Sequence, residues 1–294
     1  QQKIERSLER VENHFERGRN YQYVYGIEAV LLDLHDPTKI IGKSKGPFIT
    51  PLETYERAGA VNNVVFPTGV RIEGEKLQVF YGAADTTGCI AEVRLKDLVD
   101  SLYPPTSQPR RFSRVGNDPI IIPDKSHRWE NRAVFNPAAI DLDGSVHILY
   151  RAMGDENTSV VGYARSANAE TIDERLPEPI YVPRADFEMK RQSGNSGCED
   201  PRISKIDDRL YLLYTAYDAV NPPRVAVSSI NEKDFLARKW DWTMPSLISP
   251  TGVDDKDACL FPKKIKGNYL IFHRIGNSVD ISITKDLTFK SGEW

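Results

Sequence analysis

The sequence predicts an all-β fold, a five-bladed β-propeller with one extra helix at its N-terminus. Between residues 60 and 294 helical periodicity is nearly absent, and short runs of β-branched and aromatic residues alternate with Gly, Asp, Asn and Pro. A proline, a bend and an apolar-aromatic run that ends in Tyr or His recur four times. The prolines are Pro67, Pro137, Pro201 and Pro262, which lie 70, 64 and 61 residues apart. Such recurrence with variable loops is typical of a repeat architecture.

The N-terminal segment has the one clear helical pattern. Apolar residues at Ile4, Leu8, Val11 and Phe15 follow spacings of 4, 3 and 4, which predicts a helix over residues 1–18. We therefore divide the chain into an N-terminal helix, residues 1–20, and a propeller catalytic domain, residues 21–294.

Residues 21–34 predict two strands of a further blade, whose leading strand does not precede them in the chain. In each of the four repeats the aromatic run is followed by another short strand. These strands are Cys89 to Leu95, Val160 to Ser166, Arg224 to Ile230 and Ser278 to Thr284. Four repeats and the early pair make five blades. If the ring closes, residues 21–34 should lie beside the end of the fourth repeat.

Composition restricts the partners and the location. The net charge of -3 with both signs interspersed, and the lack of a basic stripe, argue against nucleic acid or a membrane as partner. The chain as given has no run of 18 apolar residues and no export signal. Three scattered cysteines, outside metal-ligand spacing, predict reduced thiols in a cytoplasm and no metal site; an exported protein without its signal peptide is the alternative.

The stretch Gly194 to Arg202 is the best candidate for chemistry. Pro201 has a fixed φ and is expected to push Asp200 into an extended conformation, so that this carboxylate is aimed in one direction. The alternative is a simple turn, because Gly, Asn, Ser, Asp and Pro all favour turns. The neighbouring Glu199 and Arg202 join Asp200 as site candidates, and Tyr217 could stack on a sugar or belong to the core.

Polar residues at corresponding places of the other repeats support a common site. Arg151 ends an apolar strand, where a guanidinium is costly unless it meets an anion. Equivalent positions of propeller blades converge near the axis, where substrates bind. The set comprises Asp85, Asn136, Arg151, Asp200, Lys264 and Arg274. Opposed carboxylates and cations suit cleavage of a glycosidic bond with an anion as acceptor, although a turn or a solvated loop would explain individual members.

Several of these motifs together resemble glycoside hydrolase family 130, which contains β-mannoside phosphorylases and some β-mannosidases on a five-bladed propeller. The resemblance covers nearly all of the chain from about Tyr25. The motifs are Tyr81 to Thr86, Trp129-Glu130, Ala133 to Ala138, Tyr150 to Ala152, Glu199 to Arg202, Asp255 to Ala258, Phe261 to Ile265 and His273-Arg274.

The resemblance implies specific roles. Asp200 matches the proton donor, which serves the glycosidic oxygen through a sugar hydroxyl while phosphate attacks the anomeric carbon with inversion. Asn136 and Asp85 match sugar-binding positions, and the matches to phosphate-binding cations are Arg151, Lys264 and Arg274. We add Arg151, Glu199, Arg202 and Tyr217 to the substrate-binding residues. The expected substrates are a mannoside oligosaccharide and inorganic phosphate, with mannose 1-phosphate as product and no other cofactor; a homo-oligomer is left open.

Two departures from the family pattern keep alternatives open. The segment that resembles residues 25–100 comes last in family members, so the order here is that of a circular permutation or an incomplete chain. A segment that contributes a phosphate-binding histidine has no counterpart after Trp294. One alternative is a β-mannosidase whose second carboxylate, Glu199 or a residue of the cluster 254–257, activates water. The other is a propeller that binds a glycan without cleaving it.

Overall fold

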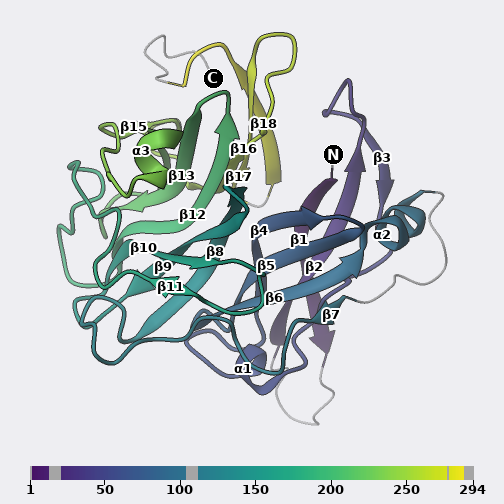
Figure 1. The fold of residues 1–294 in the computed structure, drawn as a ribbon, viewed down its shortest axis with the longest axis horizontal. Coiled ribbons are helices and arrows are strands. Elements are labelled where there is room, and N and C mark those ends of the chain that lie inside the picture. Colours follow the sequence, from purple (N-terminus) through teal and green to yellow (C-terminus); the bar gives the residue numbers. More distant parts are fainter. Residues whose placement is uncertain (1, 13–20, 104–111, 277, 288–294) are drawn as a thin grey trace. The chain divides into compact units, whose positions relative to one another are not determined.

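The computed structural model describes residues 2–12, 21–103, 112–276 and 278–287, and within these ranges it is all-β with three short helices (Figure 1). This confirms the predicted fold class at the level of secondary structure. The chain divides into two compact units, Gln1–Ile122 with Val134–Asn136 and Pro123–Ala133 with Pro137–Trp294. We describe each unit by itself. The single domain predicted over residues 21–294 stays a prediction.

The first unit consists of two antiparallel sheets with an apolar core. Ile27 and Ala29 of one sheet share this core with Val65 and Val79 of the other. The first sheet contains β1 (Gln2–Glu12), β2 (Tyr21–Leu32) and β3 (Ile40–Lys43), and the second contains β4 (Val65–Glu73), β5 (Lys76–Ala83), β6 (Thr87–Arg94) and β7 (Ser113–Arg114). Two short helices complete the unit, α1 (Thr54–Arg57) and α2 (Leu95–Leu102).

The predicted N-terminal helix is wrong over its described part. Residues 2–12 form strand β1, which pairs with β2 in one unbroken antiparallel register from Gln2 opposite Leu31 to Glu12 opposite Tyr21; residues 13–20 lie outside the described part. Helical spacing is a weak signal, and ladder hydrogen bonds with a neighbouring strand override it. The two strands expected over residues 21–34 are one strand, β2, because Gly26 allows close approach of Pro47 and does not break the strand.

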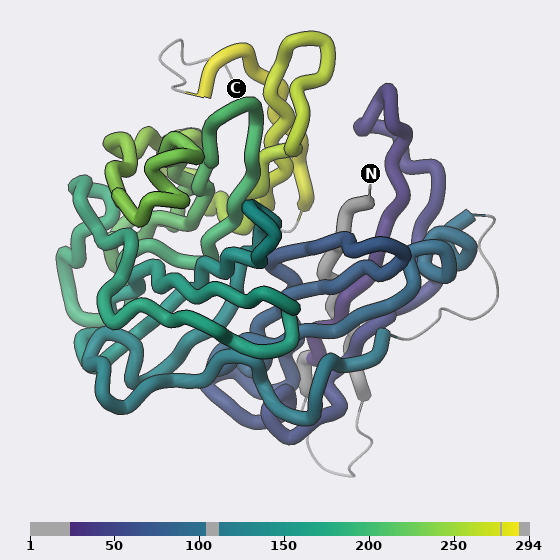
Figure 2. Tube along the Cα trace, in the orientation of Figure 1, coloured from purple at the N-terminus to yellow at the C-terminus, as the bar shows by residue number. Residues whose placement is uncertain are grey.

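The second unit stacks three layers of strands, which Figure 2 follows from teal through green to yellow. The first two layers form one eight-stranded sheet, joined where Thr158 and Ser159 of β10 pair in parallel with Ser196 and Gly197 of β12. The layers are β8 (Ala133–Leu142), β9 (Ser145–Met153), β10 (Thr158–Ser166) and β11 (Glu174–Arg175); β12 (Ser196–Ile206), β13 (Arg209–Tyr217), β14 (Arg224–Asn231) and β15 (Ser246–Leu247), with helix α3 (Glu232–Leu236); and β16 (Asp255–Leu260), β17 (Tyr269–Ile275) and β18 (Ser278–Thr284).

Both faces of the middle layer are buried. Leu212 packs with Leu149 and Val161 of the first layer, whereas Leu213 faces the other way and packs with Ile271 of the third. Successive residues of a strand point to opposite faces, so one apolar run serves two cores. The β-branched and aromatic runs of the repeats thus hold neighbouring layers face to face.

The Tyr or His that ends each aromatic run contacts a buried carboxylate that precedes the same repeat. The pairs are Tyr81 with Glu56 at 2.8 Å, Tyr150 with Glu130 at 2.9 Å, Tyr214 with Glu188, and His273 Nδ1 with Asp255 at 3.0 Å. All four carboxylates are completely buried. Burial is the main cause that raises the pKa of Tyr81, Tyr150 and Tyr214. Three Tyr–Glu contacts and one His–Asp contact thus recur at the corresponding strand ends of the four repeats.

Two of these carboxylates share the same local geometry. Glu56 accepts hydrogen bonds from the backbone N–H groups of Leu52 and Glu53, and Glu188 from those of Arg184 and Ala185, four and three residues earlier in both cases. A buried carboxylate needs such donors, because an unpaired buried charge is strongly unfavourable. Each loop is therefore anchored to the strand that ends in Tyr.

Candidate active site

A β-bulge in the first strand of two layers places an acidic residue. The register of β12 shifts between Glu199 and Arg202, and that of β16 between Lys256 and Cys259. Asp200 has a φ of 51° and Asp257 a φ of 57°, both in the left-handed region that Asp tolerates better than most residues. Bulges re-aim side chains and are frequent at active sites.

The extended conformation predicted for Asp200 is therefore wrong. Pro201 favours an extended conformation for Asp200, but the bulge overrides this preference. Strand pairing continues on both sides of the bulge, with Asp200 in the left-handed conformation. The equivalence of Pro262 with Pro201 is also wrong, since the residue that follows the bulge aspartate of β16 is Ala258. The motif Asp255 to Ala258 contained the signal, because Lys256-Asp257 occupies the positions of Glu199-Asp200.

Arg151 of β9 binds both carboxylates of β12. Its Nη2 donates to Glu199 Oε1 at 2.7 Å, its Nη1 to Asp200 Oδ1 at 3.1 Å, and its Nε to Ser159 Oγ at 3.0 Å. The Arg151 side chain is 10% exposed and each carboxylate side chain 15%. Of the two roles predicted for Arg151, the structure supports pairing with the carboxylates of the site. Such charge-assisted, oriented bonds fix Asp200 in one position.

The surroundings of Glu199 shift the pKa of its carboxyl group upward. Burial has the largest effect and raises the pKa of Glu199; the nearby Asp200 and Asp257 raise it further, whereas Arg151 and Lys256 lower it. A carboxyl group with a raised pKa among other carboxylates is a frequent feature of functional sites.

A second pair lies in the third layer. Arg274 Nη2 is 2.9 Å from Asp257 Oδ2, and the Asp257 side chain is 11% exposed. Lys256 lies opposite Arg274 in the register of β16 and β17. Because Glu199 interacts electrostatically with Lys256 and Asp257, the two pairs belong to one cluster of six charges within the second unit.

Lys264 lies apart from this cluster. It is in the turn between β16 and β17, is exposed, and its Nζ is 4.4 Å from the centre of the Tyr269 ring. Tyr269 begins β17, and Arg274 lies five residues further on, which is about 17 Å along a strand. The structure therefore does not bring Lys264 to Arg274. Lys256, which the sequence reasoning missed, takes its place as the third cation.

Arg202 and Tyr217 flank the bulge. Arg202 Nη1 lies 3.3 Å from the backbone oxygens of both Asp200 and Pro201, so this guanidinium supports the bulge backbone. Tyr217 lies opposite Gly197 and is half-buried. Because side chains alternate along a strand, Tyr217 shares its face of the sheet with Glu199.

Asn136 and Asp85 belong to the first unit. Asn136 has a φ of 50°, and its side chain covers Gly82, where an added Cβ would lie 2.0 Å from Asn136 Oδ1. Asp85, with a φ of 50°, follows Gly82 in the hairpin between β5 and β6, and Thr86 O accepts from Val134 N at 3.0 Å. The first unit thus brings Asn136 to the hairpin that carries Asp85. Convergence of these two residues with Asp200 stays a prediction.

Gly82→Ala should displace Asn136. The new methyl group would meet Asn136 Oδ1 at 2.0 Å and its backbone N at 2.9 Å, so both side chain and backbone must shift. We expect a loss of about 1–3 kcal/mol in the free energy of unfolding. Gly46→Ala is the control, because nothing lies within 4 Å of its added Cβ. Equal unfolding midpoints in urea for the two variants would contradict the packing of Asn136 on Gly82.

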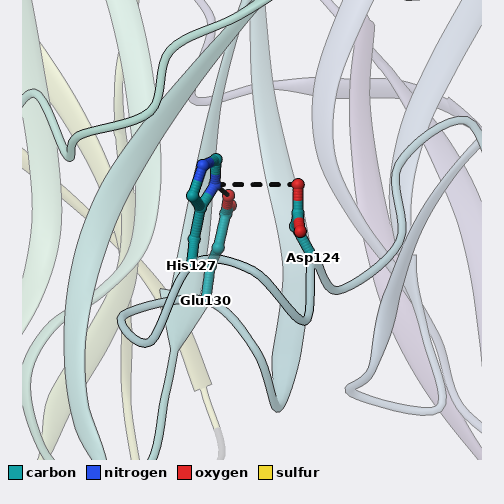
Figure 3. Close-up of side chains that lie close together, drawn as sticks. All are labelled: Asp124, His127 and Glu130. Atoms are coloured by element: carbon teal, nitrogen blue, oxygen red, sulfur yellow. Dashed lines mark hydrogen bonds and ion pairs between the residues drawn. The ribbon is translucent and has the colours of Figure 1, made fainter.

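Asp124, His127 and Glu130 offer three metal-ligand atoms within 4.8 Å of one another (Figure 3). His127 Nδ1 is 2.7 Å from Glu130 Oε1 and 3.7 Å from Asp124 Oδ2. Glu130 Oε2 accepts from Arg175 at 2.6 Å and from Tyr150. Since a guanidinium already supplies the positive charge here, we interpret the cluster as the loop anchor of the second repeat.

A Ser–His–Asp chain crosses the third layer. His273 Nε2 is 2.9 Å from Ser282 Oγ, and its Nδ1 contacts Asp255, as in a nucleophilic triad. Ser282, however, lies opposite Ile271 and on the same face, which packs into the core between the second and third layers. His273 is 4% exposed. These hydrogen bonds therefore have the same structural role in the fourth repeat that the Tyr–carboxylate contacts have in the other three.

The layered all-β fold of this chain has counterparts among solved structures. The fold is similar to that of a thermostable family-43 glycoside hydrolase, with a TM-score of 0.57 and 12% identity over 78% of this chain and 72% of that one. It is also similar to an endo-arabinase from Bacteroides thetaiotaomicron, with a TM-score of 0.56 and 14% identity over 89% of this chain and 85% of that one.

The chain belongs to glycoside hydrolase family 130, whose sequence profile, described as beta-1,4-mannooligosaccharide phosphorylase, matches residues 14–104 and 111–288. It is 34% identical over 177 residues to a beta-1,2-mannobiose phosphorylase of Thermoanaerobacter sp. (strain X514), covering 56% of this chain and 54% of that protein. It is 30% identical over 184 residues to a 1,2-beta-oligomannan phosphorylase of the same strain, covering 60% and 58%. The chain thus spans somewhat over half the length of these relatives.

The described residues contain no helix that is both long and apolar enough to cross a membrane.

Proposed function

We propose that this protein is a β-mannoside phosphorylase, which cleaves β-mannosides with inorganic phosphate to give mannose 1-phosphate. The observation that carries the proposal is the position of Asp200. It lies on a bulge, accepts a hydrogen bond from Arg151 and is near a second guanidinium–carboxylate pair. Membership of family 130 and two relatives named as mannoside phosphorylases support the substrate class.

In the proposed mechanism Asp200 is the proton donor. Its proton passes through a sugar hydroxyl to the glycosidic oxygen as the bond from that oxygen to the anomeric carbon breaks. Phosphate forms its new bond to the same carbon from the opposite side, which inverts the configuration. Asn136 and Asp85 would hold the mannosyl ring, with Glu199, Arg202 and Tyr217 also lining the sugar site, and Arg151, Lys256 and Arg274 would stabilise the phosphate.

We propose a five-bladed propeller as the architecture. Two sheets in the first unit and three layers in the second make five layers, and the four carboxylate anchors support equivalent blades. In a closed ring β2 would lie near β18, as neighbouring ends of a circle do. A crystal structure that places β2 far from β18, or that shows six or more blades, would contradict this count.

A β-mannosidase is the second candidate. It requires a carboxylate that activates water, and Asp257 is favoured over the rest of the cluster 254–257 because it occupies the bulge position of Asp200 in the next layer. Glu199 is the other candidate; Arg151 binds it at 2.7 Å, much as Arg274 binds Asp257 at 2.9 Å. A propeller that binds a glycan without cleaving it is the third candidate.

Incubation with β-1,2- and β-1,4-mannobiose, with and without phosphate, separates the three candidates. Phosphorolysis gives mannose 1-phosphate only when phosphate is present. Equal product without phosphate would overturn phosphorolysis and favour the mannosidase. Tight mannoside binding in calorimetry with no turnover under either condition would favour the binding protein.

Arg274→Ala should raise the KM for phosphate by about 10–100-fold, which corresponds to the 1.5–3 kcal/mol of a hydrogen bond to a charged group. Arg151→Ala should raise it similarly and also lower kcat, because the same guanidinium holds Asp200. Lys264→Ala is the matched control and should change the KM less than twofold, since Lys264 stacks on Tyr269. A larger effect from Lys264 than from Arg274 would contradict our placement of the phosphate.

The cytoplasmic location and the homo-oligomer stay predictions. Cys89, Cys198 and Cys259 are all free thiols. Burial raises the pKa of Cys89 to about 12, which keeps this thiol protonated and unreactive.

A further inference from the structure

The candidate site carries no net charge when its three carboxylates are all ionised. Its three carboxylates are Glu199, Asp200 and Asp257, and its three cations are Arg151, Lys256 and Arg274. Two further charges lie near the cluster: Asp254, which is half exposed to solvent and pairs with Lys256 at 3.6 Å, and Arg202, which contacts backbone oxygens. The six charges of the cluster therefore sum to zero.

A phosphate dianion would find the guanidinium groups already engaged. Arg151 binds Glu199 and Asp200, and Arg274 binds Asp257 at 2.9 Å. Two added negative charges would face three carboxylates in a largely buried site, where repulsion between charges is screened much less than in water. A lower negative charge in the cluster would therefore favour the binding of phosphate.

Glu199 is the carboxylate best placed to lose its charge. Charged groups face it from β9, β12 and β16, namely Arg151, Asp200, Lys256 and Asp257, with Arg274 of β17 beyond Asp257. Its neighbour on β13 is the uncharged Thr215. Glu199 is also bound to Arg151 Nη2 at 2.7 Å, so protonation would weaken this bond and turn an N–H toward the phosphate.

We infer that the site binds phosphate together with one proton, which Glu199 takes up as Arg151 shifts its hydrogen bond from Glu199 to the phosphate. This inference rests on the proposed phosphorolysis. Burial and the two neighbouring carboxylates, which raise the pKa of Glu199, act in the same direction. Where Glu199 is ionised in the free protein, the Kd for phosphate should rise by up to about tenfold per pH unit, because binding consumes one proton.

Proton uptake can be measured by calorimetry of inorganic phosphate binding to the full chain near pH 8, in two buffers with different ionisation enthalpies. We expect uptake of about one proton per phosphate. In Glu199→Gln binding should persist and the uptake should fall to near zero, since the amide cannot take a proton. Glu232→Gln is the matched control, because Glu232 pairs with Lys205 outside the cluster and should leave the uptake unchanged.

Asp257→Asn is an independent second variant. Removal of one negative charge from the cluster should lower the proton uptake and tighten phosphate binding several-fold. Uptake that persists in both Glu199→Gln and Asp257→Asn would place the proton on the phosphate and overturn the inference. Binding by wild type with no proton change overturns the inference alone, whereas absence of phosphate binding contradicts the proposed phosphorolysis and the inference with it.

Discussion

Asp200→Asn is expected to lower turnover of β-mannobiose by about 10²–10⁴-fold, the usual contribution of general acid catalysis. The amide cannot give a proton to the departing oxygen. The fold should persist, because Asn tolerates the left-handed backbone of position 200, at φ 51°, as well as Asp does, and its oxygen can still accept from Arg151. Initial rates at saturating phosphate measure the effect.

The control for this prediction is Asp208→Asn. Asp208 is exposed in the turn between β12 and β13, on the same hairpin as Asp200. The turnover of the Asp208→Asn variant should equal that of wild type. If Asp200→Asn retains activity within about tenfold of wild type, Asp200 is not the acid, and the bulge would have a structural role only.

Arg114→Met should cost about 3–5 kcal/mol in the free energy of unfolding, the usual penalty for removing one partner of a buried ion pair. Arg114 donates to both oxygens of Glu56 at 2.7 Å, and Glu56 has no exposed surface. The remaining partners of Glu56 are Tyr81 and two backbone N–H groups, which carry no charge. Urea unfolding at pH 7 measures the loss.

Arg94→Met is the matched control for Arg114. Arg94 makes a comparable two-bond contact with Asp97 at 3.0 Å, but its own side chain is 62% exposed. An exposed pair contributes about 0–1 kcal/mol, so this variant should unfold close to wild type. Equal losses for the two variants would show that Arg114 stabilises the protein through its packing and that its charge is unimportant.

Local patterns were sufficient to predict most strands and one contact of the candidate site, that of Arg151 with a carboxylate. The strand after each proline, its Tyr or His end and the strand that follows all lie where the period-two runs indicate. Arg151 could be predicted to meet an anion because a guanidinium at the end of an apolar strand has few other stable arrangements. Such inferences succeed because they depend on one residue and its immediate neighbours.

The same patterns failed where pairing between distant segments determines the backbone conformation. Residues 2–12 have helical spacing, yet they form β1 because β2 provides a complete ladder of partners. Asp200 is left-handed despite Pro201, because the register on either side of the bulge requires it. Only the register of β16 and β17 distinguishes the two lysines. Lys256 lies opposite Arg274, whereas Lys264 lies in the turn and contacts Tyr269.

By itself, then, the amino-acid sequence determined the all-β class, the four recurring strand runs and the pairing of Arg151 with an anion. Only the tertiary structure decided which charges meet. Backbone propensity and side-chain alternation act over a few residues and can be read along the chain. Bulge geometry, the buried carboxylate behind each terminal Tyr or His, and the balance of three cations against three carboxylates arise from contacts between residues well separated in the chain. Tyr150 and Glu130 are 20 residues apart, and Arg151 and Glu199 are 48 apart.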